Sequence, residues 1–146
     1  MIYFWITTFG GLGALSRFGI YALVSSTQFP WGTLVANALG SLLIGVMLVL
    51  RQRGGIIGGE IIHDAVMIGF MGAFTTFSAF SAQSLQMYLA GDVGYAALNV
   101  IGNVALCLIA VFIGHKFTEL LLPISAYTLE NRVFLTHYCK HFSSSA

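Results

Sequence analysis

GFMGAFTTFSAFS, residues 69 to 81, is the stretch of this sequence that decides the fold. It lies within an apolar run from about Ala65 to Ala90, which is long enough to cross a bilayer as a helix. Gly69 and Gly72 weaken a helix, and a broken helix is tolerated in lipid only where protein or water surrounds the break. We therefore expect a break near residues 72–78 at mid-membrane depth, with an unbroken, closely packed helix as the alternative. The hydroxyl groups that can compete for backbone hydrogen bonds there belong to Thr75, Thr76 and Ser78.

Three further apolar runs flank this one along the chain. They extend from Ile2 to about Ser25, from about Thr33 to Leu50 and from about Tyr95 to Ile113. Their lengths of about 18 to 24 residues are close to the roughly 20 residues that a helix needs to cross a bilayer. The sequence therefore predicts an all-α integral membrane protein with four transmembrane helices, the third of them broken. We expect one membrane domain over residues 1–118 and a flexible tail over residues 119–146.

The composition agrees with a membrane protein. Of the 146 residues, 58% are hydrophobic and only 8% are charged, whereas soluble domains carry about 25% charged residues. The net charge of +1 gives no basic surface, so nucleic acid is not an expected partner. Neither of the two cysteines, Cys107 and Cys139, belongs to a spacing that predicts a disulfide framework or a zinc site.

The polar residues inside the apolar runs are mostly neutral. Arg17 is the only charged residue within them, and no Asp or Glu lies in their interior. A proton-coupled transporter usually needs a titratable carboxylate or histidine in the membrane, so this inventory favours a passive pore or a packing role. Asn99 and Asn103 are four residues apart and therefore share one helix face, as do Asn37 and Ser41. Further neutral polar residues include Thr33, Thr75, Thr76, Ser78, Ser81, Gln83 and Ser84.

Phenylalanines recur through the third run, and Phe77 and Phe80 are three residues apart on one helix face. The edge of an aromatic ring is electropositive. Ring edges can therefore stabilise a small anion without a formal charge that would trap it. A row of phenylalanines in a membrane helix is, on its own, more often a packing feature.

Three segments together resemble the motifs of the bacterial fluoride channel family. They are GGLGALSRF at residues 10–18, WGTLVAN at residues 31–37 followed by Gly40, and GFMGAFTTFSAFS at residues 69–81. Their order and spacing match, and the resemblance covers roughly residues 3–116. Channels of this family are antiparallel dimers of four-helix subunits, with two fluoride pores along the subunit interface.

The resemblance implies roles for particular residues. Ring edges of Phe77 and Phe80 would line the pore, and Asn37 would donate its amide to fluoride. The alternative role for that amide is a hydrogen bond that holds neighbouring helices together. The remaining pore residues would be Thr33, one turn before Asn37, Thr76 and Ser78 beside the break, and Asn99 and Asn103 on the polar track of the fourth span.

The resemblance also implies a cofactor and a vestibule. Backbone carbonyls of Gly72 and Thr75 from both subunits would hold a structural sodium ion at the dimer centre. Arg17 and Gln83 would lie at a vestibule or at the subunit interface. Gln83 stands where the family commonly has glutamate, so the sequence gives no support here for a role of that carboxylate in ion entry or pH response.

The expected function is a fluoride-selective passive channel that exports fluoride from the cytoplasm across the inner membrane and so reduces its toxicity. Its partners would be fluoride, the lipid bilayer and an identical or related second subunit. Two other classes stay open: a small multidrug-type transporter, disfavoured by the missing carboxylate in the first span, and a non-transporting membrane assembly protein. Arg51, Arg53 and Lys116 share the side of the N-terminus, which favours cytoplasmic termini.

Overall fold

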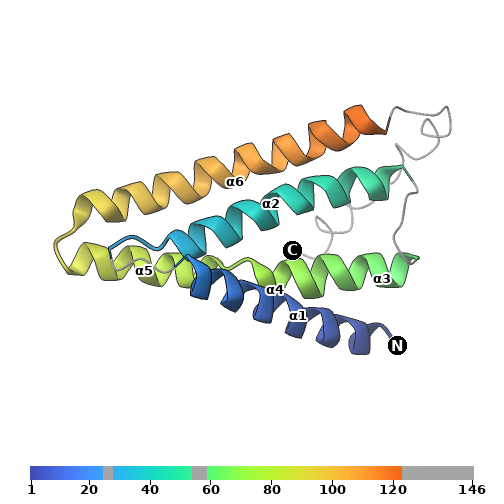
Figure 1. Cartoon of the computed structure of the whole chain (residues 1–146), viewed down its shortest axis with the longest axis horizontal. Coiled ribbons are helices and arrows are strands. Elements are labelled where there is room, and N and C mark those ends of the chain that lie inside the picture. Colours follow the sequence, from blue (N-terminus) through green and yellow to red (C-terminus); the bar gives the residue numbers. More distant parts are fainter. Residues whose placement is uncertain (25–27, 54–58, 123–146) are drawn as a thin grey trace, which may run out of the picture.

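The computed structural model describes residues 1–24, 28–53 and 59–122. All of its regular elements in these ranges are helices (Figure 1), so the prediction of an all-helical chain is confirmed for the part of the chain described. The elements in chain order are α1 (Ile2–Leu23), α2 (Trp31–Gln52), α3 (Glu60–Ala65), the π-helical η1 (Val66–Met71), α4 (Gly72–Phe74), α5 (Phe77–Leu89) and α6 (Val93–Leu121).

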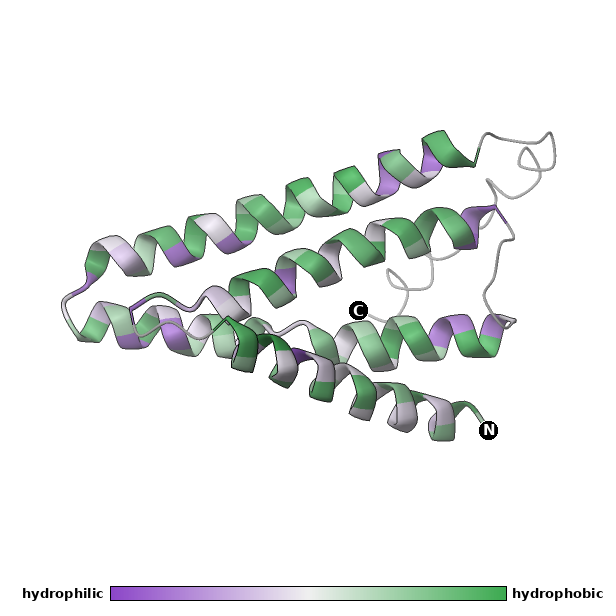
Figure 2. Ribbon diagram, viewed as in Figure 1, coloured by the Kyte–Doolittle hydropathy of each residue, from purple (hydrophilic) through white to green (hydrophobic). Residues whose placement is uncertain are grey.

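Three helical segments in the described ranges are long and apolar enough to cross a membrane. They are α2, the segment Glu60–Leu89 that contains α3 to α5, and α6, with mean hydropathies of 2.2, 1.5 and 2.4. Hydrophobic residues cover most of each helix, and hydrophilic ones lie at the ends nearest the N-terminus, along α5 and at a few positions within α2 and α6 (Figure 2). The 22-residue helix α1 is not among the three, because Arg17 and its Thr, Ser and Gly residues lower its hydropathy.

The helices extend beyond the apolar runs from which they were predicted. The third segment begins at Glu60, five residues before the apolar run that was expected to start at about Ala65. Helix α6 continues past Ile113 to Leu121. Polar residues can end an apolar run without ending a helix: Lys116 donates a hydrogen bond of 2.8 Å to Glu119 within α6, a pairing that supports the helix.

The predicted helix break is confirmed, and the alternative of an unbroken third helix is wrong. Helix α4 ends at Phe74, and the next two residues are extended, with φ and ψ of −85° and 158° at Thr75 and −153° and 110° at Thr76. Helix α5 then begins at Phe77. The π-helical turn η1 just before the break was not predicted, and such turns are rare and often lie near functional sites.

Glycines on both helices allow α2 and α6 to pack closely. Helix α6 lies beside α2, and α1 lies against the first half of the third segment (Figure 1). A Cβ at Gly45 would collide with the backbone of Val111, and one at Gly114 would collide with the backbone of Leu42. The backbones of α2 and α6 therefore touch, as small residues allow in membrane helices.

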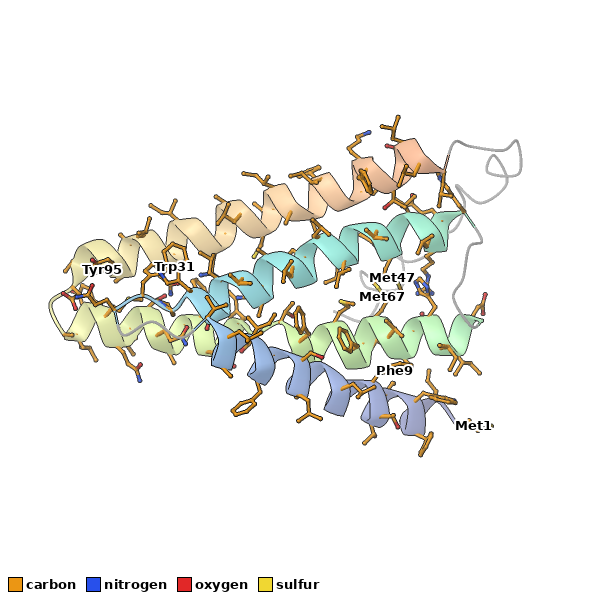
Figure 3. All side chains as sticks on the ribbon, viewed as in Figure 1. Met1, Phe9, Trp31, Met47, Met67 and Tyr95 are labelled. Carbon is orange, nitrogen blue, oxygen red and sulfur yellow. The ribbon has the colours of Figure 1, made fainter. Side chains whose placement is uncertain are left out.

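An aromatic cluster lies at the end of the molecule where α5 turns into α6. Trp31 and Tyr95 lie at this end (Figure 3), and the ring of Phe29 lies 4.7 Å from that of Trp31 and 6.4 Å from that of Tyr95, between centroids. Tryptophan and tyrosine are enriched at membrane–water interfaces. The opposite ends of α2 and the third segment carry an Arg51–Asp64 ion pair, so charged and aromatic groups mark the two ends.

Candidate functional site

The break in the third segment is held by one side chain from α2. The backbone N–H of Thr76 donates to Oδ1 of Asn37 over 2.8 Å, and Nδ2 of Asn37 donates to the carbonyl of Thr76 over 3.3 Å. Both residues are buried, with exposures of 9% for Asn37 and 6% for Thr76. The carboxamide thus replaces hydrogen bonds that Thr76 would have made in a continuous helix, as the apolar surroundings require.

A chain of hydrogen bonds leads from this clamp to α6 and back to α5. Nδ2 of Asn37 also donates to Oδ1 of Asn103 over 3.0 Å, and Nδ2 of Asn103 donates to Oδ1 of Asn99 over 2.8 Å. Nδ2 of Asn99 then donates to Oγ of Ser84 over 2.8 Å, and Ser84 donates to the carbonyl of Phe80. We call Asn37, Asn103 and Asn99 the amide chain. The prediction that Asn99 and Asn103 share one helix face is confirmed.

The break also changes the bonding of two backbone carbonyls. In a continuous α-helix the N–H groups of Thr76 and Ala79 would bond to the carbonyls of Gly72 and Thr75. Here the N–H of Thr76 donates to Asn37, and the N–H of Ala79 donates to the hydroxyl oxygen of Thr76 over 3.2 Å. Both carbonyls therefore lose their helical donors. Backbone carbonyl oxygens are ligands that hard cations accept, so their chemistry fits the predicted sodium ligands.

The two phenylalanines after the break contact each other but differ in exposure. The ring centroids of Phe77 and Phe80 are 5.3 Å apart with an interplanar angle of 60°. Phe80 is 7% exposed within the chain, whereas Phe77 is 78% exposed. The ring of Phe77 therefore projects from the surface of the single chain, at the beginning of α5.

An open groove of about 610 Å³ lies between α1 and the start of α5. Its polar lining comes from Arg17, Tyr21, Thr76 and Ser78, and the hydroxyl oxygens of the last two are 3.3 Å apart. The structure thus brings Arg17 beside the polar wall of the break. Arg17 is the one charged side chain in this lining, and the amide chain contains none.

Two of the predicted site residues, Thr33 and Gln83, belong neither to the amide chain nor to the lining of the groove. Thr33 is 1% exposed, and its hydroxyl is hydrogen-bonded to that of Tyr21 over 3.1 Å. Gln83 has a buried Oε1 with no hydrogen-bond partner in the residues that the structure describes.

Tyr21 and Ser84 were not predicted as site residues. A signal for Ser84 was present, because it is a polar residue four positions after Phe80 in an apolar run. Nothing in the local sequence around Tyr21 indicates its contact with Thr33.

The sequence matches the family described as "CrcB-like protein, Camphor Resistance (CrcB)" over residues 4–115. The chain belongs to the CrcB family. The match includes every residue of the amide chain, the break, the groove and the phenylalanine pair. The match therefore places the whole candidate site within the family's common region.

Several curated CrcB relatives carry the name fluoride-specific ion channel FluC. The relative from Opitutus terrae is 43% identical over 118 residues, which are 78% of this chain and 89% of that protein. The relative from Geobacter sulfurreducens is 39% identical over 75% of this chain and 90% of its own length. The relative from Nitrosococcus oceani is 39% identical over 80% of this chain and 95% of its own length. These relatives are named as ion channels and not as enzymes.

Proposed function

We propose that this CrcB protein is a fluoride-selective passive channel, which exports fluoride from the cytoplasm across the inner membrane. The observation that carries the proposal is the break after α4, where neutral amides, hydroxyls and two aromatic rings meet without a carboxylate. Such groups hold a small anion weakly enough for it to leave again, which conduction requires. The names of the relatives support fluoride as the ion.

The proposed channel contains two subunits, each with four spans. Helix α1 has 22 residues and is about 33 Å long at 1.5 Å per residue, which matches a bilayer core of about 30 Å. The subunits pair in antiparallel orientation, as two identical copies or with a related second chain. The exposed ring of Phe77 supports this pairing, because a second subunit would cover it.

The proposed pore runs past the break at the subunit interface. Edges of Phe77 and Phe80 stabilise the anion, and the Asn37 amide donates a hydrogen bond to it. Thr33, Thr76 and Ser78 provide neighbouring hydroxyl groups, and Asn99 and Asn103 stand behind Asn37. The groove beside Arg17 forms a vestibule where the guanidinium attracts anions, with Gln83 farther along α5.

A sodium ion would be the cofactor of the assembled channel. Carbonyls of Gly72 and Thr75 from two antiparallel subunits would supply about four oxygens around one position. The ion would be structural. Because it would bind only the assembled dimer, it would stabilise the dimer relative to the separate subunits. The support is that both carbonyls lose their helical N–H donors at the break.

An efflux experiment with purified protein in liposomes tests the function. Liposomes are loaded with potassium fluoride or potassium chloride and made permeable to potassium with valinomycin. The released anion is then measured with ion-selective electrodes. We expect fast fluoride efflux and retained chloride, because chloride is larger and more weakly held by these donors. Comparable efflux of both anions, or fluoride movement only with a proton gradient, would overturn the proposal.

A further inference from the structure

We propose that Asn99 and Asn103 are positioning residues of this pore. With Asn37 they form a chain of amides in which every hydrogen bond is donated in the same direction, and this chain fixes the start of α5 and the ring of Phe80. Their role in a pore rests on the function proposed above. The chain of bonds itself is a property of the fold. In this proposal the two residues of α6 do not themselves donate to the anion.

The direction of the amide chain is set by the backbone at the break. The N–H of Thr76 can only donate, so Asn37 must present Oδ1 to it. Nδ2 of Asn37 then faces Asn103, which must accept with Oδ1 and so turns its own Nδ2 toward Asn99. Reversing any amide would bring two donors or two acceptors together in a buried site, which is costly.

The donors of the amide chain are used up inside the protein. A carboxamide has two N–H groups, and those of Asn103 are directed to Oδ1 and the carbonyl of Asn99, over 2.8 and 3.1 Å. Those of Asn99 are directed to Ser84 and to the carbonyl of Phe80, over 2.8 and 3.5 Å. The 3.5 Å bond of Asn99 is longer than the 3.3 Å bond of Asn37 to the carbonyl of Thr76, but Asn99 is 0% exposed and Asn37 is 9% exposed, so the bond of Asn37 is the one that an anion can reach and replace. Asn37 is thus the amide that can serve the anion, and the other two hold it in place.

Both ends of the amide chain are fixed to the same helix. Thr76 directly precedes α5, and Phe80 and Ser84 lie in its first turns. Asn99 and Asn103 are 0% and 4% exposed, so their bonds are protected from competing water. Two points of attachment fix the helix in position and in rotation. The ring of Phe80 is therefore placed by residues of α6 that do not line the groove.

A spectroscopic experiment on the full chain tests this proposal. 4-Fluorophenylalanine is incorporated at position 80, and its ¹⁹F signal is recorded in the wild-type sequence and in N103L, N103D and T118V. Thr118 is the matched control, because it is also buried on α6 but its hydroxyl bonds only to the carbonyl of Gly114, outside the amide chain. We expect N103L to shift or broaden the signal and T118V to leave it unchanged.

N103D gives a readout that a purely structural role would not produce. A protonated carboxyl keeps both links, because one oxygen accepts from Asn37 and the O–H donates to Asn99. An ionised carboxylate has no donor and breaks the second link. The groups bonded to residue 103 are neutral amides, so we expect the N103D signal to resemble wild type at acidic pH and to depart from it at alkaline pH, where only the link to Asn37 is left. Fluoride efflux of N103L should fall by about tenfold or more, because the variant loses the bond that Asn103 accepts from Asn37 and the two that it donates to Asn99.

Each outcome decides the proposal. An unchanged signal in N103L, an equal change in T118V, or an N103D signal that does not depend on pH would overturn it. If N103L does not fold, the pH dependence of N103D decides alone. If the wild-type chain conducts no fluoride, the proposed function fails, but the ¹⁹F signals still show whether the amide chain places Phe80.

Discussion

Helices α2 and α6 meet in two different ways along their length. Near Gly45 and Gly114 the two backbones touch, because the atoms nearest to each glycine belong to the backbone of the other helix. About two turns earlier on α2, the same helices meet through Asn37 and Asn103, which share a buried hydrogen bond of 3.0 Å. Close packing suffices where both helices are continuous. Carboxamides are needed beside Thr76, because the break leaves backbone groups without helical partners in an apolar environment.

The largest effect is expected from placing a side chain at Gly45, where the backbones of α2 and α6 touch. In G45L the new side chain would collide with the backbone of Val111, which cannot move aside as a flexible side chain can. Overpacking that side chains can absorb costs about 1–3 kcal/mol, but here two helix backbones would have to separate, so we expect almost no folded protein, a larger effect than that of any substitution below. The control is G102A, on α6, where an added Cβ meets no atom within 4 Å. Size-exclusion chromatography and thermal unfolding measure the difference; equal behaviour of the two variants would refute the close contact.

The next effect is expected from removing the clamp at the break. N37L takes away the acceptor of the Thr76 N–H and the donor to Asn103. Each buried group left without a partner costs about 1–3 kcal/mol, so the expected loss of unfolding free energy is about 2–6 kcal/mol, with loss of fluoride efflux. S41A is the control, four residues along the same helix. Denaturant unfolding measures both variants, and a loss no larger than that of S41A would contradict the clamp.

A more selective effect is expected from the phenylalanine pair. F80I keeps most of the apolar volume and removes the ring edge, so stability should change by less than about 1.5 kcal/mol while fluoride efflux falls sharply. F74I is the control, because Phe74 is also buried and stacks on Phe70 with centroids 5.6 Å apart, outside the proposed pore. If fluoride efflux is equally preserved in F80I and F74I, the result would show that Phe80 has only a packing role.

The smallest effect is expected from shortening the chain. A protein that ends at Leu122 retains all of the region that matches the family, residues 4–115. We expect its fluoride efflux to stay within about twofold of the full chain, because the sequence predicts a flexible tail in this part of the chain. Loss of efflux or of assembly would assign the segment from residue 123 onward a role that the proposal does not contain.

Local features of the structure were predictable from the sequence. The break was predicted because Gly69, Gly72 and three hydroxyl residues all weaken a helix in one place. The common face of Asn99 and Asn103 followed from their spacing alone. Both predictions depend on neighbours along the chain, which is what a single sequence records.

Contacts between distant segments could not be predicted in this way. The bond from Asn37 to Asn103 joins residues 66 positions apart, and that from Asn37 to Thr76 joins residues 39 positions apart. Spacing gives the face on which an amide lies, but not the partner that it meets. The shared hydrogen bond of Tyr21 and Thr33 was missed for the same reason. The predicted sodium ion, the antiparallel pairing and the tail beyond residue 122, which lies outside the described residues, stay predictions.

Reversal potentials in a planar bilayer test the central claim most directly. Purified protein is incorporated between solutions with a fluoride gradient, equal chloride and equal pH, and the current is recorded as a function of voltage. A passive fluoride channel predicts that the current reverses at the Nernst potential of fluoride and that a pH gradient does not move this value. Reversal near zero, or a reversal potential that follows the pH gradient, would contradict the account.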